Sequence, residues 1–89
     1  MIPVYILAIE DESDREYMTW LYCQYEKLMF STIRKYTNDS WLVDDIMQST
    51  LEKLMCKISL LKSLTRNRLI SYIISSCKNN AYIILQYQS

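Results

Sequence analysis

The sequence contains no glycine and no histidine, and its single proline is Pro3. Tight β-turns, β-bulges and phosphate-binding loops depend on glycine, so β architectures and glycine-rich nucleotide loops are excluded. Histidine is the commonest general acid–base and the commonest metal ligand, and its absence argues against most catalytic and metal centres. Because 51% of the residues are hydrophobic, the chain can form a core, and a helical protein with short connections remains.

The cysteines indicate a reducing compartment, and the short apolar runs argue against a membrane-spanning helix. The three cysteines, Cys23, Cys56 and Cys77, form no C-x-x-C pair, and their odd number does not suit a disulfide framework. We therefore expect three buried or half-buried free thiols in a reducing cytosol. The longest apolar run, Ile2 to Ile9, contains Pro3 and is too short to span a bilayer. The sequence thus predicts a soluble, cytoplasmic protein that does not interact with a membrane.

The charges are unevenly divided along the chain, although their sum is zero. All ten acidic residues lie within 1–52 together with four basic ones, whereas residues 53–89 hold six basic residues and no acid. Such asymmetry is typical of a chain whose halves meet different partners, and the basic half suits a polyanion. The alternative is that folding pairs the charges across helices. The composition does not decide between these two interpretations.

Apolar residues recur at spacings of three and four along most of the chain, which is the pattern of amphipathic helices. An all-α, compact three- to four-helix bundle is therefore the predicted fold, with one domain over residues 1–89. The expected elements are one short helix and three long ones, at about 2–9, 14–37, 40–59 and 65–87.

Polar residues mark the expected helix ends. Ser13 to Glu16 has the pattern of a capping box, Thr37 to Ser40 favours a turn, and Thr65 is a suitable cap for the last helix. The segment Ser59 to Thr65 combines apolar residues with stop signals, so its structure stays ambiguous. Large apolar side chains on or near the helical stripes are expected in the core, among them Trp20, Trp41, Met29, Met47 and Met55.

Four segments form an ordered set of motifs: Ile9 to Arg15, Tyr22 to Phe30 (YCQYEKLMF), Asp44 to Leu54 (DDIMQSTLEKL) and Thr65 to Ala81 (TRNRLISYIISSCKNNA). Together they resemble region 2 of the extracytoplasmic-function group of the sigma-70 family of transcription factors. The third segment is similar to region 2.2 and the fourth to regions 2.3 and 2.4. The resemblance covers nearly the whole chain, in the family's order. It does not include the family's C-terminal domain, so we expect an isolated region 2 domain.

The resemblance implies a transcription initiation factor without catalytic activity or cofactor. In the family, region 2.2 docks on the clamp coiled coil of the largest RNA polymerase subunit. The corresponding residues here are Asp45, Gln48, Ser49 and Glu52. Independently of the resemblance, residues 45, 48 and 52 share one helix face opposite the apolar stripe. Taken alone, such a face is more often simply solvated.

The family also captures the non-template strand of the promoter minus-ten element and holds flipped bases. Such capture needs cations for phosphates, amides for base edges and rings for stacking. The last helix and its leading loop supply each type in Lys62, Arg66, Arg68, Tyr72, Lys78, Asn79, Asn80 and Tyr82. This interpretation requires that the cationic and amide side chains point outward as one surface while the aliphatic ridge faces inward. For any single tyrosine, the edge of the core is the simpler explanation.

A second interpretation is a degenerate sigma-like interaction module that binds polymerase or an anti-sigma factor but no DNA. Ser49, Ile83 and Gln86 motivate it, because the family usually has an acid, an aspartate and a basic residue at these places. An enzyme is the third class and is set aside. A carboxylate pair such as Asp44 and Asp45 diverges by about 100° on a helix and cannot converge on one substrate atom.

Overall fold

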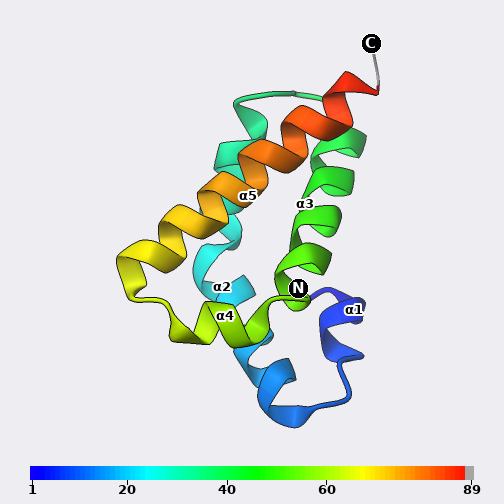
Figure 1. Cartoon of the computed structure of the whole chain (residues 1–89). Coiled ribbons are helices and arrows are strands. Elements are labelled where there is room, and N and C mark those ends of the chain that lie inside the picture. Colours follow the sequence, from blue (N-terminus) through cyan, green and yellow to red (C-terminus); the bar gives the residue numbers. More distant parts are fainter. Residues whose placement is uncertain (88–89) are drawn as a thin grey trace.

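The computed structural model describes residues 1–87, and all the regular structure within them is helical. The helices are α1 (Val4–Leu7), α2 (Glu12–Arg34), α3 (Ser40–Met55), α4 (Ile58–Ser63) and α5 (Arg66–Gln86), as Figure 1 shows. The all-α prediction is confirmed. Three long helices and a short N-terminal one were expected, and α4 is an additional short helix in the segment that the sequence left ambiguous.

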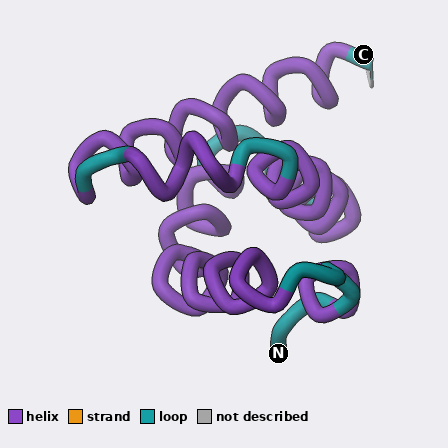
Figure 2. Tube along the Cα trace, turned by 60° about the horizontal axis from the view of Figure 1, so that its bottom comes forward, coloured by secondary structure: helices purple, strands orange, loops and turns teal. Residues whose placement is uncertain are grey.

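The three long helices pack on one another. Helix α5 lies across both α2 and α3, which also contact each other (Figure 1). The short helices close one end, because α1 packs against α2 and α4 packs against both α2 and α3. Figure 2 shows that only short loops join these helices. None of the helices within residues 1–87 is long and apolar enough to cross a membrane.

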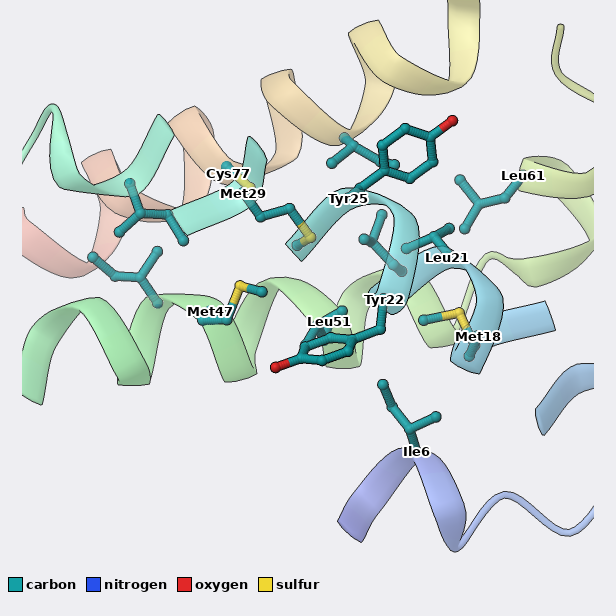
Figure 3. Close-up of a cluster of buried hydrophobic side chains, with 14 of the residues drawn as sticks. Ile6, Met18, Leu21, Tyr22, Tyr25, Met29, Met47, Leu51, Leu61 and Cys77 are labelled. Atoms are coloured by element: carbon teal, nitrogen blue, oxygen red, sulfur yellow. The ribbon is translucent and has the colours of Figure 1, made fainter. Parts of the chain in front are cut away.

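Every helix contributes a buried side chain to one core. Figure 3 shows Ile6, Leu21, Leu51, Leu61 and Cys77 converging from α1, α2, α3, α4 and α5 in turn, and each is at most 1% exposed. The aliphatic stripes predicted from the three- and four-residue spacing therefore face one another. The same burial fixes which faces of α3 and α5 remain for a partner.

Helix α2 begins two residues before its predicted start at residue 14 and ends at Arg34, three residues earlier than expected. The carboxylate of Asp11, not the hydroxyl of Ser13, caps the helix and accepts a hydrogen bond from the Asp14 amide at 2.9 Å. This choice places Glu12 and Asp14 in the first turn, where acidic side chains are favoured by the helix dipole. The guanidinium of Arg15 then donates to the Ile9 carbonyl at 2.8 Å, which ties the end of α1 to α2.

The second predicted long helix, at about 40–59, ends four residues earlier, at Met55. Asp39 caps α3 and accepts from the amides of Trp41 and Leu42 at 2.9 and 3.2 Å. The chain then breaks at Cys56 and Lys57, where no glycine or proline announces a stop. The new direction buries the apolar side of α4, so tertiary packing overrides local propensity at this place.

Helix α5 matches the sequence prediction closely. The Thr65 hydroxyl caps it by accepting from the Arg68 amide at 3.4 Å. Its aliphatic ridge, formed by Leu69, Ile73, Cys77 and Ala81, is buried against α2 and α3. The inward half of the expectation for this helix is therefore confirmed.

Both tryptophans were expected in the core, and this expectation is wrong. Trp41 is 82% exposed, because it lies in the first turn of α3, at the tip of the bundle. Trp20 is 44% exposed and stacks at the edge of α2 against Tyr17 and Tyr25. The expected burial of Met29 and Met47 is confirmed, and Met55 packs against the core while partly exposed. Helical spacing thus predicts which residues form an apolar stripe, but not which of them a neighbouring helix buries.

The cysteines also differ from the expectation. Cys77 is buried, whereas Cys23 and Cys56 are exposed. Burial raises the pKa of the Cys77 thiol to about 12. This thiol is therefore a packing residue, and the other two are surface groups.

Candidate nucleic-acid and protein interfaces

The outer side of α3 carries a short acidic strip. Asp45, Gln48 and Glu52 are exposed, and Ser49 beside them is half-buried. The Gln48 side-chain amide donates to the Glu52 carboxylate at 3.1 Å, so these two residues are held together across one helical turn. We call these four residues the acidic strip. The structure therefore brings together all four residues that were predicted to dock on a protein.

Helix α1 lies at the edge of the acidic strip. The Tyr5 side chain is half-buried, and its pKa is raised first by burial and second by the nearby Glu52 carboxylate. The phenol therefore stays neutral beside the acid. The strip is bordered by an aromatic group, and Glu52 keeps its negative charge free of an ion pair within residues 1–87.

The charges of the two halves of the chain do not cancel inside the fold. Within residues 1–87 a single ion pair forms, between Lys62 and Asp14 at 3.5 Å, and both side chains are more than a third exposed. All charged side chains of the sequence lie within these residues. The pairing alternative left open by the composition is therefore not what the structure shows. The acidic and basic groups remain at the surface, where partners can reach them.

A groove runs between the C-terminal end of α3 and the middle of α5. Its volume is about 370 Å³, and we call it the α3–α5 groove. Two exposed lysines one helical turn apart stand on the α3 side. An aromatic ring, a hydroxyl and amides line the α5 side, so the polar lining consists of Lys53, Lys57, Tyr72, Ser76, Asn79 and Asn80.

A second hollow of about 400 Å³ adjoins the groove on α5. Tyr72 lines both, so its ring lies between them. Arg68 supplies a cation to the second hollow, and amide and hydroxyl groups come from Asn67, Ser71 and Ser75. Cations, ring faces and amides are the groups that unpaired nucleotides need for phosphate contact, stacking and base-edge hydrogen bonds.

Asn80 is a predicted DNA contact that the structure places inside. It is 2% exposed and accepts a hydrogen bond from the Lys53 ammonium at 2.6 Å. Its amide then donates to the buried Thr50 hydroxyl at 3.0 Å, which in turn donates to the Ile46 carbonyl at 2.7 Å. A buried amide is stable only when its polar atoms are satisfied. The side-chain groups of Asn80 thus join α3 to α5, and its expected role as a free base contact is corrected.

The other predicted DNA contacts are divided between surfaces. Arg68, Tyr72 and Asn79 lie within about 40° of one another around α5, whereas Lys78 is turned about 100° away. Lys78 and Tyr82 are exposed but line neither the groove nor the second hollow. Arg66, Lys78 and Asn79 therefore do not form one strip, contrary to the expectation of a single outward surface on this helix.

Lys62 and Arg66 lie on another side of the bundle. The Lys62 ammonium contacts Asp14, donates to the Ser13 hydroxyl at 3.1 Å and stands 5.5 Å from the centre of the Tyr17 ring. Arg66 lines the same hollow as Lys62, away from the α3–α5 groove. These two cations therefore belong to a different candidate site from Arg68.

Sequence reasoning did not single out Lys53 and Lys57 as contacts, although it counted them among the cations of the acid-free half. The available signal was their spacing of four residues at the end of the second long helix. Spacing alone could not show that this end faces α5. Only the packing of α3 on α5 turns two ordinary surface lysines into one wall of a groove.

No protein-family model, curated protein or solved structure matches this chain. Among residues 1–87 there is also no cluster of histidine, cysteine, aspartate or glutamate side chains that could hold a metal ion. The geometry of the two surfaces and the motifs of the sequence are therefore the indications of function.

Proposed function

We propose that this chain is a cytoplasmic transcription initiation domain of the sigma region 2 type, acting by binding and not by catalysis. In this proposal the acidic strip of α3 docks on the clamp coiled coil of RNA polymerase. The α3–α5 groove and the adjoining hollow hold the unpaired non-template strand of the promoter minus-ten element. An anti-sigma factor that covers either surface would act as a negative regulator.

The acidic strip supports the docking part of the proposal. Asp45 and Glu52 are exposed acids without ion-pair partners within residues 1–87, and they share one side of a rigid helix. An acidic helix face complements a basic helix of a partner and raises specificity and association rate more than affinity. We therefore expect the docking contact to be fast and sensitive to salt.

The groove supports the strand-binding part. Stacking of one base on a ring contributes about 1–3 kcal/mol, and opening one base-pair step costs about 1–2 kcal/mol. Tyr72 is the ring that lines both hollows, so stacking there offsets about one opened step. With the cations of Lys57 and Arg68 on phosphates, the domain would hold a few opened bases. It would not melt a duplex without polymerase.

The observation that carries the proposal is the separation of charge. Lys62–Asp14 is the single internal ion pair within residues 1–87. The acids of α3 and the cations around the groove are therefore left for two different partners. A nucleic acid and a basic protein helix are the pair of partners that fit such a division.

A second function remains in view, namely an interaction module that binds polymerase or an anti-sigma factor without DNA. The observation in its favour is that Asn80 is engaged inside the chain and that Lys62 lines a different hollow, so the α3–α5 groove lacks two of the predicted strand contacts. The two functions differ only in whether the groove binds a strand, so one experiment separates them.

The test uses the fluorescence anisotropy of a labelled single-stranded minus-ten oligonucleotide, with and without a clamp coiled-coil fragment. We expect low-salt binding that the fragment strengthens and that Lys57→Glu weakens about tenfold by losing a phosphate contact. Lys27→Glu makes the same charge change on an exposed part of α2 that lines neither hollow and serves as the matched control. Binding of the fragment with no oligonucleotide binding would select the interaction module. Absence of both would contradict the proposal.

A further inference from the structure

A third hollow lies between α2, α4 and the start of α5. Its volume is about 390 Å³. It shares no lining residue with the α3–α5 groove and meets the second hollow at Leu64. Its lining combines aromatic rings of α2 with cations of α4 and α5. We call it the aromatic hollow.

The rings of the aromatic hollow are arranged as an open aromatic wall. Trp20 stands 5.7 Å from Tyr17 at an interplanar angle of 41°, and 6.0 Å from Tyr25 in an edge-on arrangement. Trp20 is also 44% exposed, so part of its indole is not covered by the chain. An exposed indole beside two tyrosines is a suitable surface for stacking a flat aromatic group. Gln24 adds an amide that can both donate and accept at the edge of such a group.

Two cations line the aromatic hollow beside these rings. The Lys62 ammonium lies 5.5 Å from the centre of the Tyr17 ring. Arg66 is exposed, lines the hollow and has no ion-pair partner within residues 1–87. A guanidinium binds phosphate oxygens through two parallel hydrogen bonds. The hollow therefore offers an anion site beside a stacking site.

We propose that the aromatic hollow binds one nucleoside monophosphate unit, with its base on Trp20 and its phosphate on Arg66 and Lys62. Asp14 lies 3.5 Å from the Lys62 ammonium, so a negative charge stands beside the phosphate position. Lys62 therefore shares its charge with Asp14, whereas Arg66 has no ion pair within residues 1–87. The unit is either a free mononucleotide or an unpaired nucleotide of a strand, since both present the same base and phosphate.

The proposal does not depend on the function assigned to the α3–α5 groove. Its test uses the full chain with Trp41→Phe, which leaves Trp20 as the single tryptophan, because the sequence contains two. Trp20 emission is followed during titration with adenosine monophosphate, adenosine and a single-stranded tetranucleotide. We expect saturable quenching by the monophosphate, and at least about tenfold weaker binding of adenosine, which lacks the charged group.

Variants assign the quenching to the hollow. Arg66→Ala is expected to weaken monophosphate binding about tenfold, because a charge-assisted contact is lost. Arg34→Ala is the matched control, since it removes an exposed arginine of α2 that lines neither this hollow nor the α3–α5 groove, and it should leave the affinity unchanged. Circular dichroism checks that each variant is folded.

The two sources of the nucleotide are separated by the same titration. A tetranucleotide that binds more tightly than the monophosphate, and loses that affinity in Arg66→Ala, assigns the hollow to a strand. Equal or tighter binding of the monophosphate assigns it to a free nucleotide. Absence of saturable quenching by either at millimolar concentrations would overturn the proposal, as would quenching that Arg66→Ala leaves unchanged. These results are independent of the Lys57→Glu experiment, so failure of one proposal does not imply failure of the other.

Discussion

The acidic strip and the α3–α5 groove meet at two neighbouring residues of α3, Glu52 and Lys53. The charged groups of these two residues have different hydrogen-bond partners. Within residues 1–87 the Glu52 side chain is hydrogen-bonded to Gln48, another exposed residue of the same helix. Lys53 is hydrogen-bonded to Asn80, which continues into the buried Thr50. The residues of the strip thus contribute to the surface of one helix, whereas one wall of the groove is part of the contact between two helices. Substitutions should therefore affect binding alone at the strip, but binding and stability together at the groove.

The largest loss of stability is expected from a core substitution in α3, the helix that the two regions share. Leu51 is fully buried in α3, the helix that carries the acidic strip and one wall of the groove. Leu51→Ala should lower the free energy of unfolding by about 2–5 kcal/mol, because it removes packed methyl groups and leaves a cavity. Urea denaturation followed by circular dichroism measures this. Leu60→Ala, at a 44% exposed position, is the control, and an equal loss there would show that burial is not the cause.

Substitution of one amide residue in the groove and one in the acidic strip tests whether the two regions contribute differently to stability. Asn80→Ala leaves the buried Thr50 hydroxyl and the Lys53 ammonium without their partner, and should cost about 1–3 kcal/mol of stability. Gln48→Ala removes the exposed hydrogen bond to Glu52 and should change stability by less than about 0.5 kcal/mol. Urea midpoints of the two variants give the answer. Equal losses would mean that the groove is no more a part of the fold than the strip is.

The effect of pH comes from two groups of the shared core that ionise above about pH 9. Burial raises the pKa of the Cys77 thiol from 9.0 to about 12. Burial, followed by its hydrogen bond to Glu26, raises that of Tyr22 from 10.0 to about 12. The unfolded chain therefore loses these protons first, and stability should fall as the pH rises above about 9 and continue to fall towards 12. Cys77→Ala should remove the part of the decline that begins near pH 9. A urea midpoint that stays constant or rises between pH 8 and 11 would contradict this sign.

The sequence predicts those features that depend on local pattern. Thr65 as the cap of α5 and the inward ridge containing Leu69 and Ile73 follow from residue type and helical period, and both are present. The four residues of the acidic strip share one helix face for the same reason. These features require no knowledge of which helix lies beside which.

Features that depend on neighbouring helices could not be read from the sequence. Helix α3 ends after Met55 without glycine or proline, because the change of direction there buries the apolar side of α4. Trp41 follows the apolar stripe but lies at a tip of the bundle that no other helix covers. Asn80 resembles an exposed base contact until the packing of α5 on α3 places it beside Lys53. Helical period identifies the inward face, but only the arrangement of the helices shows where coverage ends.

The most direct test of the account measures whether the two charged surfaces act separately. The affinities for a single-stranded minus-ten oligonucleotide and for a basic clamp coiled-coil fragment are measured over a range of salt concentrations. The variants are Arg68→Glu beside Tyr72 and Asp45→Lys on the acidic strip. We predict that Arg68→Glu weakens oligonucleotide binding, reduces its salt dependence by about one ion and leaves fragment binding unchanged. Asp45→Lys should do the reverse, weakening only the fragment. If either substitution weakens both partners equally, or neither partner, the division of the molecule into two independent surfaces is wrong.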